Sequence, residues 1–87
     1  MASNYTLSGP VTLSEEQILA LQARLSKMRH DVVGRLANIT AAAELIRLRP
    51  ESTEERLRLL LEQPHQAAEL IAQFSREFEA TFGLTRL

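Results

Sequence analysis

The chain has 87 residues and a net charge of -1 at pH 7, which suits one small domain without the basic face that nucleic-acid binding requires. It contains no cysteine, so disulfide bonds and thiolate metal sites are excluded. No apolar run approaches the roughly 18 residues of a membrane span, and the polar segment MASNYTLSGP is not a secretory signal. Leucine, alanine, glutamate and arginine dominate, as in long helices. Composition therefore predicts a cytoplasmic helical protein that binds no metal, cofactor, nucleic acid or membrane.

A long helix is predicted over residues 14–49. Ser14 can cap its first turn, and Gln17, three residues later, can complete a capping box. The helix should end before Pro50, because proline disfavours helical geometry in the residue that precedes it. Residues 1–13 contain serine, asparagine, threonine and a Gly-Pro pair without helical periodicity, so we expect a flexible arm there.

A heptad pattern marks the core side of this helix. Large apolar residues recur every seven positions, and a companion row accompanies them; the two rows are Ile18, Leu25, Val32, Ile39 and Ile46, and Leu21, Met28 and Ala42. Arg35 interrupts the companion row, and Gly34 beside it costs about 1 kcal/mol relative to alanine inside a helix. We therefore expect a bend or a local loosening of the helix at this point.

A second helix is predicted over residues 52–82. Ser52 and Glu55 can form its capping box. Pro64 should kink or split this helix, because proline lacks the backbone N–H that a helix interior uses. Residues 84–87 follow as a short tail.

The short turn between the two helices predicts an all-α fold in which residues 14–83 form an antiparallel helical hairpin. Both apolar stripes are wider than a single helix–helix seam needs. Two helices cannot enclose a core by themselves, so the simplest closure is a two-fold homodimer that forms a four-helix bundle.

His30 is the main candidate for chemistry. The heptad places it on the outer face of the first helix, opposite the apolar stripe. A purely solvated face would carry mostly Glu, Lys and Gln, whereas the neighbours of His30 are mostly small and weakly polar, which favours docking of a partner. The predicted docking residues are Ser26, Lys27, Val33, Gly34, Ala37 and Ala41. His65 has no second ligand one turn away and is interpreted as a surface residue.

The segment HDVVGRLANITAAAEL resembles the phosphoacceptor segment of bacterial sensor histidine kinases, in their dimerisation and histidine-phosphotransfer domain. The resemblance covers residues 28–46, and its matching residues are His30, Asp31, Leu36, Ile39, Glu44, Leu45 and Ile46. That family forms a dimeric four-helix bundle with the phosphorylated histidine exposed on the first helix.

The resemblance implies that His30 is a nucleophile that accepts a phosphoryl group. It implies that Asp31 accepts a hydrogen bond from the other ring nitrogen and so orients the imidazole. The implied partners are a second copy of the chain and the receiver domain of a response regulator. A separate kinase ATP-binding domain is a further implied source of the phosphoryl group.

The chain departs from the family pattern at two residues. Gly34 stands where the family often has Asn or Thr to position water for dephosphorylation, so phosphatase activity is not expected. Arg35 stands where many members have proline. With three glycines in all, the chain has no room for the glycine-rich ATP-binding domain, and we do not expect it to phosphorylate itself.

Three interpretations therefore remain open. The first is a phosphotransfer module that carries a phosphoryl group on His30. The second is a catalytically silent relative that keeps the bundle and binds a kinase or a response regulator through its outer face. The third is a purely structural dimerisation bundle whose resemblance to the kinases is accidental.

Overall fold

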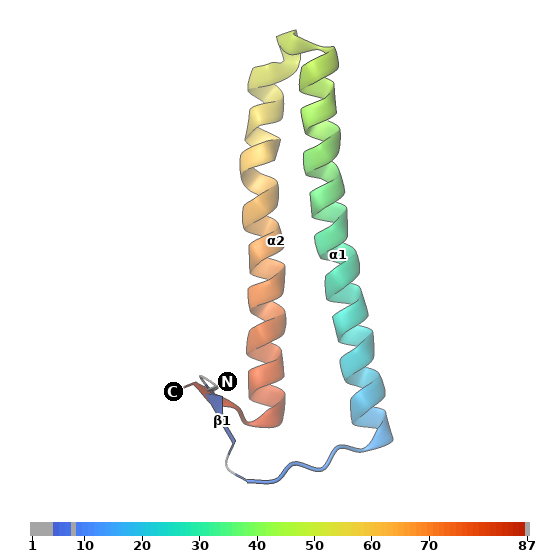
Figure 1. The fold of residues 1–87 in the computed structure, drawn as a ribbon, viewed down its shortest axis with the longest axis vertical. Coiled ribbons are helices and arrows are strands. Elements are labelled where there is room, and N and C mark those ends of the chain that lie inside the picture. Colours follow the sequence, from blue (N-terminus) through green and yellow to red (C-terminus); the bar gives the residue numbers. More distant parts are fainter. Residues whose placement is uncertain (1–4, 8, 87) are drawn as a thin grey trace.

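The computed structural model describes residues 5–7 and 9–86 of the chain. Two long helices, α1 (Glu15–Leu48) and α2 (Thr53–Phe82), run antiparallel beside each other and are joined by a short 3-10 turn at Pro50–Ser52 (Figure 1). The all-α class predicted from the sequence is confirmed. In the described ranges, neither helix is long and apolar enough to cross a membrane.

The start of α1 is fixed by the capping box that the sequence predicts. The Ser14 hydroxyl accepts the backbone N–H of Gln17 at 3.1 Å, and the Gln17 side chain accepts the backbone N–H of Ser14 at 2.8 Å. Two of the unpaired donors of the first turn thus gain partners. The helix ends at Leu48, and the backbone N–H of Arg49 still bonds to the carbonyl of Leu45 at 2.7 Å.

The prediction of a second capping box, at the start of α2, is wrong. Ser52 belongs to the 3-10 turn and lacks the extended backbone of a cap, and its hydroxyl donates back to the Arg49 carbonyl at 2.8 Å. The hydroxyl therefore does not face the first turn of α2, where Glu55 would complete the box. α2 also continues through Pro64 without being split. Helix packing on α1 outweighs the single backbone bond that proline removes.

Both ends of the chain meet at the open end of the helix pair. β1 (Tyr5–Thr6) pairs antiparallel with β2 (Thr85–Arg86), with Tyr5 opposite Arg86. The segments expected as a flexible arm (1–13) and a tail (84–87) are thus partly strand, because each supplies backbone partners to the other. Residues 1–4, 8 and 87 lie outside the described part of the chain. Gly83 permits the ribbon by ending α2 with a left-handed conformation (φ 63°).

The contact between the helices changes character along their length. Ala42, six residues before the end of α1, and Ala67, near the middle of α2, are buried, and their small side chains suit close packing of the helices. Toward the open end, the helices diverge (Figure 1), and α2 carries there a row of three stacked aromatic rings, those of Phe74, Phe78 and Phe82. The ring centroids of Phe74 and Phe78 are 6.2 Å apart, and those of Phe78 and Phe82 are 4.8 Å apart. Both distances are within the usual range for aromatic pairs.

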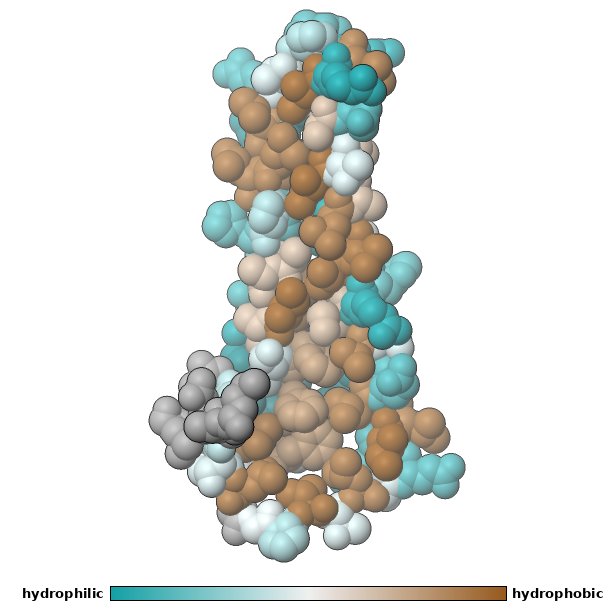
Figure 2. Space-filling view, in the orientation of Figure 1, coloured by the Kyte–Doolittle hydropathy of each residue, from teal (hydrophilic) through white to brown (hydrophobic). Residues whose placement is uncertain are grey.

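One side of the helix pair keeps large apolar residues exposed. Side chains advance by about 100° per residue around a helix, so Leu36 lies about 120° to one side of buried Ala42, and His30 about 120° to the other. On α2, Leu57 and Ile71 are displaced from Ala67 in the same rotational sense as Leu36 is from Ala42. Because the helices are antiparallel, these flanks share one side of the pair. We call this the apolar side and define it by Leu36, Leu57, Leu61 and Ile71, all exposed. Figure 2 shows hydrophobic residues over both helices along the molecule.

Candidate functional site

His30 lies on the flank of α1 that faces away from the apolar side. Its side chain is exposed, and it borders a shallow hollow of about 340 Å³ between the helices. Five of the six lining residues come from two turns of α1, and one comes from α2; they are His30, Asp31, Gly34, Arg35, Asn38 and Leu70. The hollow therefore combines a nucleophilic ring, a carboxylate, a guanidinium and an amide with one apolar wall.

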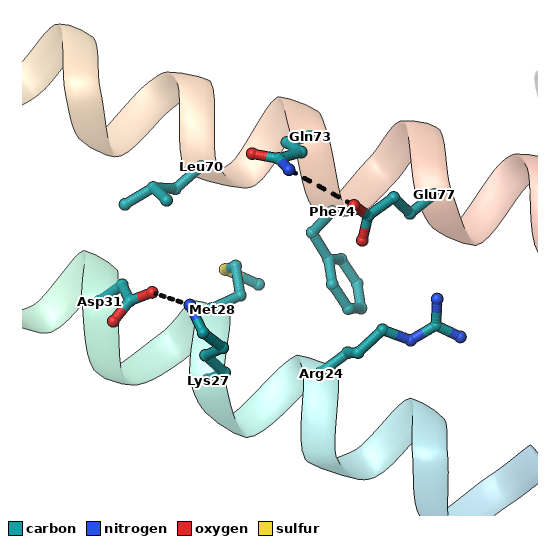
Figure 3. Close-up of a pocket in the computed structure, with 8 residues that line it drawn as sticks. All are labelled: Arg24, Lys27, Met28, Asp31, Leu70, Gln73, Phe74 and Glu77. Carbon is teal, nitrogen blue, oxygen red and sulfur yellow. Dashed lines mark hydrogen bonds and ion pairs between the residues drawn. The ribbon is translucent and has the colours of Figure 1, made fainter.

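A second depression continues from this hollow toward the open end of the pair. It measures about 240 Å³, and Asp31 and Leu70 border both depressions, so the two form one groove. Figure 3 shows Met28 and Leu70 between the helices, Phe74 reaching from α2 toward α1, and polar groups along both rims. The rim of this second depression is formed by Arg24, Lys27, Asp31, Gln73 and Glu77. The groove thus has an apolar floor and charged edges.

Asp31 forms an ion pair with Lys27, which lies one helical turn before it in α1. Lys27 Nζ donates to Asp31 Oδ2 at 3.0 Å, and Figure 3 shows the two side chains directed at each other. Among the described residues, Asp31 makes no hydrogen bond to His30. The ion pair is exposed on the lysine side, so its contribution to stability is a few tenths of a kcal/mol and the carboxylate is easily released. The role of Asp31 in orienting the imidazole stays a prediction.

Gly34 leaves space beside His30. A Cβ added at Gly34 would meet no atom within 4 Å other than its own helical neighbours, so the glycine is not required by packing. Its position is about 40° around the helix from His30, on the side of the hollow. The missing side chain keeps this side of the imidazole open to an incoming group.

The other predicted docking residues surround His30 on α1. At about 100° per residue, all six fall within about 60° of His30 around the helix axis, so they form one outer surface. Lys27 borders the groove, and Gly34 borders the hollow. Val33 is 57% exposed but lies on the flank away from α2. Ser26 receives a hydrogen bond from Gln22, and Ala37 and Ala41 are exposed.

Two functional candidates were missed by reasoning from the sequence alone. Arg35, noted as an interruption of the heptad and as a departure from the family pattern, is half-buried and lines the hollow. Asn38 lines the hollow too, and its amide donates to the side chain of Gln63 at 3.1 Å across the helix pair. Gln63 is only 5% exposed. Three polar residues facing the seam between two amphipathic helices were the available signal.

The described residues do not suggest a metal centre. Within them, no group of three His, Cys, Asp or Glu side chains is close enough to hold an ion. His65 is exposed on α2 and borders neither depression of the groove. Of the two histidines, His30 is therefore the one that borders the groove.

Comparison of the chain with protein-family models, with curated proteins and with solved structures finds no match in any of the three. Function must therefore be inferred from the chain's own residues and their arrangement.

Proposed function

We propose that this chain is a histidine phosphotransfer and dimerisation module, in which His30 exchanges a phosphoryl group with an aspartate of a response-regulator receiver domain. The supporting observation is the hollow beside His30. An exposed imidazole borders an open space that also carries a guanidinium and an amide, and both of these groups donate hydrogen bonds to anionic oxygens.

The proposed reaction is a phosphoryl transfer at one ring nitrogen. The lone pair of the neutral imidazole attacks the phosphorus of the receiver's aspartyl phosphate, so an N–P bond forms. The P–O bond to the aspartate breaks, and its electron pair returns to the carboxylate. The proton on the other ring nitrogen stays there, and in this proposal Asp31, the next residue along the chain, leaves Lys27 and stabilises the resulting imidazolium.

Homodimerisation is the second part of the proposal. An isolated helix pair leaves four large side chains of the apolar side in contact with water, at a cost of about 1.5–3 kcal/mol for each one that burial could remove. A two-fold copy packed on this side would cover them and form a four-helix bundle. His30 lies on the other flank and would stay accessible.

The groove supports docking of a second protein. Its apolar floor offers Met28, Leu70 and Phe74, while its rim carries both cationic and anionic side chains. A receiver helix with apolar residues on one face and mixed charges at its edges fits this chemistry. A kinase ATP-binding domain, supplied as a separate protein, would be an alternative phosphoryl donor at the same histidine.

Phosphotransfer to purified receiver domains tests the proposal. The chain is mixed with a panel of receivers carrying radiolabelled aspartyl phosphate, and separately with ATP and isolated kinase ATP-binding domains. We expect an acid-labile, alkali-stable label on the chain that disappears in His30→Ala and persists in His65→Ala, a matched control because both histidines are exposed on helices. Label retained in His30→Ala would contradict the proposal.

One observation favours a second candidate, the catalytically silent binding module. Asp31 is paired with Lys27 and not with the imidazole it is predicted to orient. In that case the groove binds a kinase or receiver without phosphoryl exchange. Co-sedimentation with the same receivers would then detect a complex that His30→Ala leaves intact, while no label appears in any mixture.

A further inference from the structure

We propose that Arg35 is the residue that binds the phosphoryl group carried by His30. This inference deepens the proposed phosphotransfer function, on which it rests. It assigns the recognition of the transferred group to a side chain at which the heptad pattern calls for an apolar residue.

Among the described residues, no side chain pairs with the charge of Arg35. Within the part of the chain that the structure describes, its guanidinium forms no hydrogen bond or ion pair. The nitrogens of Arg35 are not among the buried unpaired side-chain atoms of the described residues, so its aliphatic stem is half-buried while its charge can still reach an incoming anion. Arg35 stands where the heptad pattern calls for an apolar residue, and it brings a positive charge to the edge of the hollow.

The carboxylates closest to Arg35 in the sequence and at the hollow are paired with other cations. Asp31, one turn earlier, is held by Lys27 at 3.0 Å. On α2, the residue that lines the hollow is Leu70, and the adjacent Glu69 binds Arg76 at 2.9 Å. Besides Asp31 and Arg35, the ionisable side chain that lines the hollow is His30 itself. In this structure the hollow therefore has one cation without a partner, Arg35, and one carboxylate, Asp31, that is already paired with Lys27.

The hollow has open space for a phosphoryl group between His30 and Arg35. His30 and Arg35 border the same open space, and Gly34 between them places no side chain there. A phosphoryl group attached to the His30 ring would enter this space with two negative charges. Arginine has a planar fork of donors that matches phosphoryl oxygens and is always charged. Asn38 is fixed by Gln63 at the far edge of the hollow and has one amide hydrogen left to donate.

The experiment uses phosphoramidate, a small phosphoryl donor that needs no partner protein. In its reaction with imidazole, the N–P bond to ammonia breaks and a new N–P bond to the ring forms. The full-length chain carrying His65→Ala is labelled at His30, and the phosphorus resonance of the product is followed by NMR as a function of pH. The midpoint reports the second ionisation of the phosphoryl group in the presence or absence of the neighbouring guanidinium.

A cation beside the phosphoryl group favours its dianion and so lowers the pH midpoint. We expect Arg35→Gln to weaken the acidity constant by about three-fold, as for a partly exposed ion pair, and Arg35→Lys to retain most of the effect. Arg58→Gln serves as the control. Arg58 is exposed near the turn, so this substitution removes the same charge far from the hollow. Raising the salt concentration should shrink the difference between the parent chain and Arg35→Gln.

Two results would overturn the assignment of Arg35. One is the same midpoint in the parent chain, Arg35→Gln and Arg58→Gln, with helicity retained in all three. The other is a failure of phosphoramidate to label His30, because the hollow would then not admit the group. A shifted midpoint without exchange with any receiver would keep the Arg35 site and remove the proposed function. Exchange without a shifted midpoint would do the reverse.

Discussion

The two sides of the helix pair use the same two helices for opposite purposes. On the apolar side, large aliphatic residues such as Leu36 and Ile71 are exposed although nothing in a single chain covers them. On the other side, small and polar residues surround His30, and Arg35, at a seam position where the heptad calls for an apolar residue, borders the same hollow. Between the sides lies a narrow buried seam at Ala42 and Ala67.

The difference teaches how a small helical protein can combine stability with accessibility. A wide apolar stripe lets one flank of each helix pack in the seam and leaves the second flank exposed, where we propose that another copy packs. The opposite flank then needs no apolar residues and can keep a glycine and a charge near a reactive ring. If this division is right, substitutions should have effects that depend on the side more than on the exposure of the residue.

The largest effect is expected for a charge on the apolar side. Leu36→Glu should raise the dissociation constant of the dimer at least about 100-fold, because the glutamate would be buried without a partner in each copy. The control is Leu48→Glu, which introduces the same charge into the same helix. Leu36 is 51% exposed and Leu48 is 66% exposed, but Leu48 lies on the flank of His30.

Sedimentation equilibrium of the parent chain and both variants measures this effect. We expect dimers for the parent chain and for Leu48→Glu, and monomers or partly unfolded chains for Leu36→Glu. Equal masses for all three proteins would show that the apolar side is not an interface between copies. Far-UV circular dichroism distinguishes a folded monomer from an unfolded chain.

An intermediate effect is expected at the boundary between the two sides. Asn38→Ala removes the partner of Gln63, which is 5% exposed, and should lower the free energy of unfolding by about 1–3 kcal/mol. Replacing both residues by leucine should recover most of this loss, because no buried polar group is then left unpaired. Urea unfolding of Asn38→Ala measures this loss, and Asn38→Leu, Gln63→Leu and the variant with both substitutions form the double-mutant cycle. Additive losses in the double variant would contradict the coupling.

The smallest effect is expected at Gly34. Gly34→Ala should raise the free energy of unfolding by about 0.5–1 kcal/mol, because glycine is disfavoured inside a helix and the added methyl group meets nothing. Thermal unfolding followed by circular dichroism measures the change. A loss of stability would mean that the site is covered, for example by another copy, and that the flank of His30 is not free.

The sequence was sufficient for features that depend on neighbours along the chain. Both hydrogen bonds of the Ser14–Gln17 box join residues three apart, and the seven-residue recurrence of apolar residues set the helical class. It failed at Ser52 because the 3-10 turn reorients the hydroxyl, and this depends on how Pro50 joins the two helices. A motif of spacing alone cannot distinguish a cap from a turn.

The hollow beside His30 could not be predicted from the sequence, for a different reason. Its wall at Leu70 comes from 40 positions further along the chain, and its far edge depends on the pairing of Asn38 with Gln63. Such contacts follow from the register of the two helices, which a heptad pattern leaves free to slide by a whole repeat. The exposure of His30 could be predicted from periodicity, whereas the charge beside it required the structure.

The ribbon between the chain ends has a consequence for the order of folding. Its two strands lie about 80 residues apart in sequence, so closing that loop in an unstructured chain would cost roughly 4 kcal/mol of entropy, which a ladder of two residues per strand cannot offset. The ribbon can form only after α1 and α2 have brought its strands together, so we expect it to be the last contact made and the first to open. Its amide hydrogens should exchange with solvent while those of both helices are still protected.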